Sequence, residues 1–167
     1  LLGLFAGLGV LSKYLFIYLL IGIKLFFIYY LKKDKKFSLR YFIPIVVFLL
    51  VLSPHLIWLA DNDYKTIAYG LKRTGFENST FLNHFVHPLK FILKQIGILL
   101  PFFILLILVV KNFKSKFNQQ DKKLIFLIFI TFVPILLMLI TSLVFAANIR
   151  TMWMTPFYLF FGLFFVY

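Results

Sequence analysis

Two adjacent basic residues, Lys72 and Arg73, stand inside the long polar stretch 61–90 and could bind an anionic group. A guanidinium group stays charged at physiological pH, and its planar fork can bond two phosphate oxygens at once. Two more cations, Lys13 and Arg150, stand at boundaries between apolar runs. A charge beside apolar sequence has a free-energy cost and hints at a functional partner. These four residues are therefore the candidates for phosphate recognition.

Ordinary structural roles would also explain these cations. Lys72 and Arg73 come at the end of a short predicted helix, where a cation interacts favourably with the helix dipole by about 0.3–1 kcal/mol. Lys13 could extend its ammonium group to the lipid headgroups while its alkyl stem stays in apolar surroundings. Both interpretations stay open on the sequence alone.

Other kinds of chemistry have less support. His84 and His87 are three residues apart and could share one helix face, which is half of a metal site. No cysteine, carboxylate or third histidine stands beside them at ligand spacing, so we predict no metal and no cofactor. The nucleophile-elbow, phosphate-loop and HExxH motifs are missing, which argues against catalysis of the soluble type. The triplet Asn78-Ser79-Thr80 matches a glycosylation acceptor.

The composition indicates a membrane protein. Hydrophobic residues make up 63% of the chain and charged residues only 14%, whereas soluble domains carry about 25% charge. A net charge of +13 would suggest nucleic acid in a soluble protein, but here the basic residues cluster between apolar runs. We therefore predict contact with membrane lipids and no nucleic-acid partner. The chain has no cysteine, so disulfides are excluded.

Apolar runs of membrane-spanning length define the expected fold. A shorter run, 1–11, contains Gly3, Gly7 and Gly9, which would permit close helix packing. Pro54 and Pro134 predict kinks or broken turns within their runs. We expect an all-α, polytopic transmembrane helix bundle of about five spans plus a partial one, with short juxtamembrane surface helices. The long runs are 14–31, 41–60, 92–110 and 124–147, and a last one, 151–167, reaches the end of the chain.

The polar connection 61–90 is expected to begin with a short amphipathic helix on the membrane surface. Its apolar residues recur at helical spacing, either Asp61 or Asn62 could cap its start, and Gly75 could stop it. A second surface segment is predicted around 81–91. The apolar positions of the first helix are Tyr64, Ile67, Ala68 and Leu71.

Loop charges predict the orientation. The loops 32–40 and 111–123 hold ten of the 18 Lys and Arg residues and would lie on the same side of the membrane. The positive-inside rule makes that side cytoplasmic, which places the connection 61–90, Lys13 and Arg150 on the extracytoplasmic side. The chain begins without methionine and ends inside an apolar run. We therefore expect residues 1–167 to be a single transmembrane domain truncated at both ends.

Three stretches together resemble glycosyltransferase family 39 of the GT-C class, whose members include the dolichyl-phosphate-mannose protein mannosyltransferases and the lipid A aminoarabinose transferase. They are GLFAGLGVLSKY at 3–14, PHLIWLADNDY running on to LKRTG at 54–75, and IRTMWMTPFYL at 149–159. The resemblance implies a membrane enzyme that moves a sugar from a polyprenyl-phosphate carrier to a lipid or protein acceptor. It also implies a bacterial inner-membrane location with a periplasmic active face.

The resemblance implies a phosphate-binding role for Arg73 and for Lys13, with Lys72 and Arg150 as neighbouring cations. The catalytic aspartate of the family lies upstream of the stretches matched here, so the catalytic residue stays unknown and the chain alone is expected to be inactive. A transporter or flippase for a lipid-linked sugar is the alternative, since it too would use outer-face cations and proline-containing spans.

Overall fold

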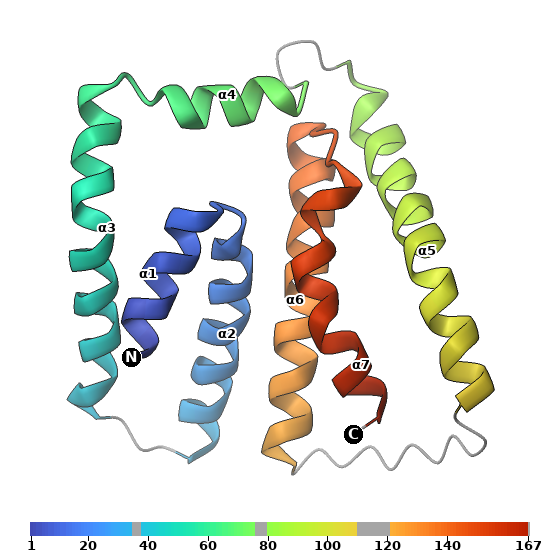
Figure 1. The fold of residues 1–167 in the computed structure, drawn as a ribbon, viewed down its shortest axis with the longest axis horizontal. Coiled ribbons are helices and arrows are strands. Elements are labelled where there is room, and N and C mark those ends of the chain that lie inside the picture. The colour runs from blue at the N-terminus through green and yellow to red at the C-terminus, as the bar shows by residue number, and fades with distance from the viewer. Residues whose placement is uncertain (35–37, 76–79, 110–120, 167) are drawn as a thin grey trace.

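The computed structural model describes residues 1–34, 38–75, 80–109 and 121–166, and within these ranges it contains helices and no strand (Figure 1). This confirms the predicted all-α class. The α-helices are α1 (Leu2–Ser12), α2 (Phe16–Asp34), α3 (Ile43–Asp61), α4 (Lys65–Arg73), α5 (Asn83–Val109), α6 (Lys122–Phe145) and α7 (Leu159–Val166). Short 3-10 helices are η1 (Leu39–Phe42), η3 (Thr151–Trp153) and η4 (Thr155–Tyr158).

Three helical segments are long and apolar enough to cross a membrane: Leu39–Asp61, Asn83–Val109 and Lys122–Phe145. Helix α2 has 19 residues, but it carries Lys24 and, in its last turn, Lys32 and Lys33. Two further apolar helical segments, Leu2–Ser12 and Thr155–Phe165, are shorter than a span. The structure therefore supports an integral membrane protein, and the count of about five spans stays a prediction.

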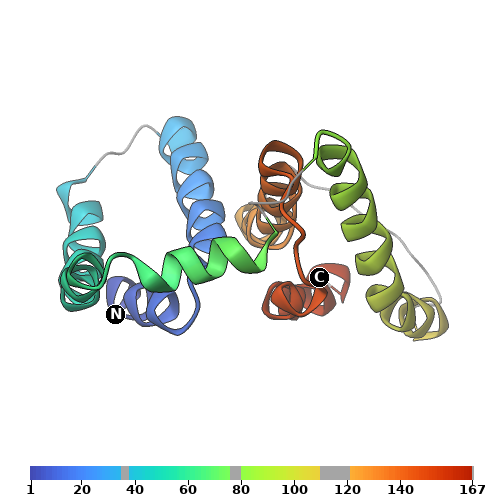
Figure 2. The same ribbon diagram turned by 90° about the horizontal axis from the view of Figure 1, so that it is seen from above.

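Helix α4 lies across one end of the bundle (Figure 1). The turn between α1 and α2, the start of α5 and the end of α6 lie at this same end. Viewed from above, α4 runs from the group formed by α1, α2 and α3 toward the group formed by α5, α6 and α7 (Figure 2). The end of α2 and the start of α6, which flank the predicted basic loops, lie at the opposite end.

Close glycine contacts join α1 to its neighbours, as the sequence predicts. A Cβ on Gly3 would overlap the backbone carbonyl of Pro44 in α3, and one on Gly7 would lie 2.6 Å from Cγ1 of Val51. Because glycine has no Cβ, the backbones of α1 and α3 approach closely at these two points.

Helices α2 and α6 join the two groups of helices. The Tyr18 hydroxyl is 2.9 Å from Oγ1 of Thr141, so the two hydroxyl groups share a hydrogen bond. Near the other end, the ammonium of Lys122 lies 4.3 Å from the ring centroid of Tyr30. Polar contacts at both ends of this pair therefore support the apolar packing between them.

Helix α3 continues through Pro54 without a broken turn. Proline has no N–H, so it cannot bond the carbonyl four residues earlier, which belongs to Leu50. The Ser53 hydroxyl donates a 2.9 Å hydrogen bond to that carbonyl and replaces the missing donor. Helix α6 likewise continues through Pro134.

Two expectations about the connection 61–90 are wrong. Asp61 is the last residue of α3 and Asn62 is its C-cap, so neither residue caps α4, which begins after Tyr64. The segment around 81–91 is not a separate surface element, because α5 starts at Asn83 and runs without interruption to Val109. In both cases a spanning helix extends beyond its apolar run.

The predicted stop of α4 is confirmed. Gly75 has a φ of 71°, a left-handed conformation that glycine adopts without steric cost. Its N–H donates a 3.1 Å hydrogen bond to the carbonyl of Lys72 and so satisfies one of the last carbonyls of the helix.

Candidate functional site

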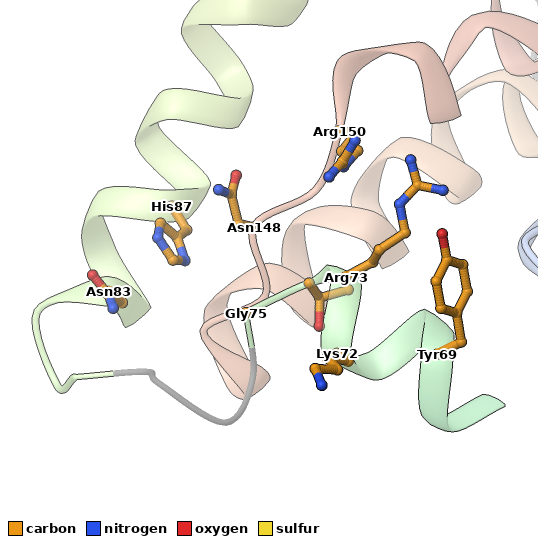
Figure 3. Close-up of a pocket in the computed structure, with 9 residues that line it drawn as sticks. Tyr69, Lys72, Arg73, Gly75, Asn83, His87, Asn148 and Arg150 are labelled. Carbon is orange, nitrogen blue, oxygen red and sulfur yellow. The ribbon is translucent and has the colours of Figure 1, made fainter. Parts of the chain in front are cut away.

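The end of α4, the start of α5 and the segment 146–150 between α6 and η3 surround an open pocket of about 520 Å³ (Figure 3). A volume of this size is within the range of small-molecule sites, about 300–1,000 Å³. The lining residues are Tyr69, Lys72, Arg73, Thr74, Gly75, Asn83, His87, Asn148 and Arg150.

Helix α4 positions Arg73 through a neighbour one turn earlier. Tyr69 and Arg73 are four residues apart and therefore share a helix face. The guanidinium carbon of Arg73 lies 5.6 Å from the centroid of the Tyr69 ring, within the range of a cation–π interaction. This contact restricts the long side chain, and Figure 3 shows the guanidinium beside the Tyr69 hydroxyl and to the right of Arg150 in that view.

The segment 146–150 carries the opposite wall of the pocket in irregular, non-helical backbone. From Ala147 on its side chains alternate: Ala147 and Ile149 are buried, whereas Asn148 and Arg150 are exposed and line the pocket. Burial of Ala147 and Ile149 therefore leaves the other pair to line the pocket.

Three hydrogen bonds hold this segment in place. The Nδ1 atom of His87 lies 2.6 Å from the carbonyl oxygen of Ala146, and the Ser142 hydroxyl donates to the carbonyl of Ala147 at 2.8 Å. The backbone N–H of Asn148 donates to the carbonyl of Thr74 at 2.9 Å. The segment is thus tied to α5, α6 and α4 at successive residues.

A packed apolar cluster holds in place the segment 146–150, which lines the pocket. It brings together residues of α5, α6, the segment 146–150 and η4, with Leu15, just before α2, and Leu19 of α2 packed against it. Side chains buried in this way hold the backbone that carries Asn148 and Arg150 in a single arrangement. The buried members are Phe91, Met138, Ala147, Ile149, Met154 and Phe157.

The charge of the pocket is positive. Lys72, Arg73 and Arg150 all line it, and the lining residues that the structure describes include no carboxylate. Within the described ranges, none of these three cations forms an ion pair that would neutralise it. A phosphate group would therefore find several charge-assisted donors in one place.

Lys13 is placed apart from the other predicted site residues. Its ammonium group donates a 3.4 Å hydrogen bond to the backbone carbonyl of Trp153, and it is not one of the pocket-lining residues. The structure thus brings Lys72, Arg73 and Arg150 together, whereas Lys13 joins the turn between α1 and α2 to η3.

The histidines have structural partners. His84 lies with Nδ1 2.7 Å from the carbonyl of Leu143, and His87 is bound in the same way to Ala146. Among the described residues, no group of three or more His, Cys, Asp or Glu side chains could hold a metal ion. Asn78 and Ser79 of the predicted glycosylation triplet lie outside the described ranges.

Sequence reasoning missed Tyr69, Thr74, Asn83 and Asn148 as lining residues, and it considered Gly75 and His87 only in other roles. The spacing of Tyr69 and Arg73 was visible, since residues four apart share a helix face. Asn83, His87 and Asn148 come from other segments of the chain and have no local pattern that relates them to Arg73. No family model, curated protein or solved structure shows significant similarity to the chain.

Proposed function

We propose that this protein is a membrane glycosyltransferase that takes a sugar from a polyprenyl-phosphate carrier and transfers it to a lipid or protein acceptor. One observation carries the proposal: three cations from two elements line a single pocket at one end of a bundle of apolar helices. The carrier combines a phosphate group with a long apolar tail. The pocket suits the phosphate group, and the neighbouring membrane suits the apolar tail.

The role of the cations follows from the charge that develops during transfer. The bond between the sugar C1 and the phosphate oxygen breaks, and its electron pair stays on that oxygen. The acceptor hydroxyl oxygen forms the new bond to C1 and loses its proton to a base that is not assigned to a residue of this chain. Fixed cations stabilise the departing phosphate without having to reorganise.

Exposed apolar side chains on the two helices that line the pocket suit the carrier tail. On α4, Ile67 and Leu71 are 41% and 52% exposed, and on α5 Leu89 is 60% exposed. In a membrane these side chains contact lipid, so a polyprenyl chain can lie along them while its phosphate enters the pocket. The pocket faces the extracytoplasmic side in this proposal, which in a bacterium is the periplasmic face of the inner membrane.

Binding of a short-chain polyprenyl phosphate to the full chain in lipid nanodiscs tests the phosphate site. We expect Arg73→Ala to weaken binding at least about tenfold, equivalent to about 1.4 kcal/mol. Lys65→Ala is the matched control, because Lys65 begins the same helix and does not line the pocket. Unchanged binding by the Arg73 variant, or equal loss in both variants, would remove Arg73 from the site.

A second measurement tests the reaction itself. Radiolabelled sugar should move from the carrier to an acceptor in membranes that contain the full-length protein, and Arg73→Ala in that protein should reduce this transfer at least about tenfold. Movement of intact lipid-linked sugar across the membrane, without cleavage of its sugar–phosphate bond, would instead identify a transporter.

A further inference from the structure

We infer that the pocket has two chemically different halves, and that Asn83, His87 and Asn148 form a subsite for the hydroxyl groups of an uncharged sugar. This inference rests on the proposed function and names the substrate class of the same pocket. In Figure 3, Asn83 and His87 project from α5 on one side, whereas Tyr69 and Arg73 project from α4 on the other.

The three cations that line the pocket offer donors only. Arginine and lysine side chains carry N–H groups and have no acceptor atom, so Lys72, Arg73 and Arg150 match a phosphate, whose ionised oxygens only accept. A sugar hydroxyl both donates and accepts, and a cluster of cations would leave its donor unused.

His87 offers an acceptor. A backbone carbonyl can only accept, so the 2.6 Å contact with Ala146 requires Nδ1 of His87 to carry a proton. In the neutral ring Nε2 then has a lone pair, and within the described part of the chain this atom has no hydrogen-bond partner. A lone pair would repel an ionised phosphate oxygen but accepts a hydrogen bond from a sugar hydroxyl.

Asn83 and Asn148 are the other two uncharged polar side chains of the subsite. Each carboxamide has both donor and acceptor atoms, which matches the dual character of a hydroxyl group. Neither side chain forms a hydrogen bond with any other described residue, although the backbone N–H of Asn148 binds Thr74. Both amides line the pocket and are therefore available to a ligand.

The charge of the pocket selects among sugars. An amino sugar would bring an ammonium group into a pocket lined by three cations, so like-charge repulsion disfavours it. An uncharged hexose has no such cost and can use all three neutral side chains. The two halves together therefore fit a polyprenyl-phosphate hexose, with the phosphate near Arg73 and the hydroxyl groups near α5.

Two lipids that differ only in the presence of the sugar test the phosphate half and the sugar half of the pocket separately. We measure binding of a short-chain polyprenyl phosphate, with and without a linked hexose, to the full chain in nanodiscs. Asn148→Ala should weaken binding of the hexose-bearing lipid about fivefold, the value of roughly one lost hydrogen bond, and change binding of the bare phosphate less than about twofold. Arg73→Ala should weaken binding of both lipids.

His87→Asn is the second variant, because the asparagine amide can still donate to the Ala146 carbonyl while it lacks Nε2. It should show the same selective loss as Asn148→Ala, and an unchanged thermal midpoint would show that the segment 146–150 is intact. Equal losses for both lipids, or no loss for either, would overturn the sugar subsite. Preference of the wild type for an amino-sugar lipid would overturn it as well.

These binding measurements distinguish failure of the proposed function from failure of the sugar subsite. If the wild type binds neither lipid, the proposed function fails and the subsite fails with it. If it binds the bare phosphate and the hexose adds no affinity, the phosphate site stands and only the sugar subsite is rejected.

Discussion

The backbone N–H of Asn148 donates a 2.9 Å hydrogen bond to the carbonyl oxygen of Thr74. This bond joins the end of α4 to the segment that follows α6, and so brings Arg73 and Arg150 to the same pocket. Thr66, earlier in α4, has a second tie, since its hydroxyl lies 2.8 Å from that of Tyr14. The geometry of the pocket therefore depends on how α4 ends.

Replacing Gly75 with alanine should loosen this end. A residue with a Cβ pays about 1–2 kcal/mol in the left-handed conformation that Gly75 adopts with a φ of 71°. We expect hydrogen exchange at the Asn148 amide to accelerate about tenfold. Gly70→Ala is the control, because that glycine lies inside α4 with nothing near its Cβ position, and exchange in α4 should slow. Equal exchange in the two variants would refute the role of Gly75.

Ser142 and Thr131 form a contrasting pair of fully buried hydroxyl groups. Ser142→Ala removes the donor to the Ala147 carbonyl and should lower the free energy of unfolding by about 1–3 kcal/mol. The Thr131 hydroxyl is buried without a hydrogen-bond partner among the described residues, so Thr131→Val should be neutral or stabilising. Thermal unfolding in detergent checks both variants, and similar shifts would contradict the hydrogen bonding described.

Gly3→Ala should separate α1 from α3. The added Cβ would overlap the carbonyl of Pro44, and such overpacking typically costs about 1–3 kcal/mol. Gly97→Ala is the matched control, since a Cβ at that position in α5 meets nothing within 4 Å. We expect a lower thermal midpoint for the first variant and an unchanged or higher one for the second. Two equal midpoints would argue against the close contact.

Single cysteines test the orientation, because the chain has none of its own. A cysteine in place of exposed Lys65 in α4 should react with a membrane-impermeant thiol reagent added to intact cells. A cysteine in place of exposed Lys33, at the opposite end of the bundle, should react only after the cells are lysed. The reverse pattern of labelling would invert the predicted topology.

Much of the helical framework could be predicted because its signals are local. Apolar runs predicted long helices, and the spacing of Tyr64, Ile67, Ala68 and Leu71 predicted α4, although Tyr64 is its N-cap and not part of it. The boundaries were less predictable. A helix extends past the edge of its apolar run as long as its backbone hydrogen bonds continue. Helix α3 therefore includes Asp61, and α5 already begins at Asn83.

The sequence by itself determined the helical class, the apolar helix surfaces, the cations at the ends of helices and the end of α4 at Gly75. These features depend on composition, periodicity and glycine stereochemistry, which act over a few residues. Only the tertiary structure decided which cations meet. Arg150 joins Arg73 because Ala147 and Ile149 are buried and Asn148 binds Thr74, whereas Lys13 binds the carbonyl of Trp153. These contacts join residues far apart in the chain, and packing of the whole bundle brings them together.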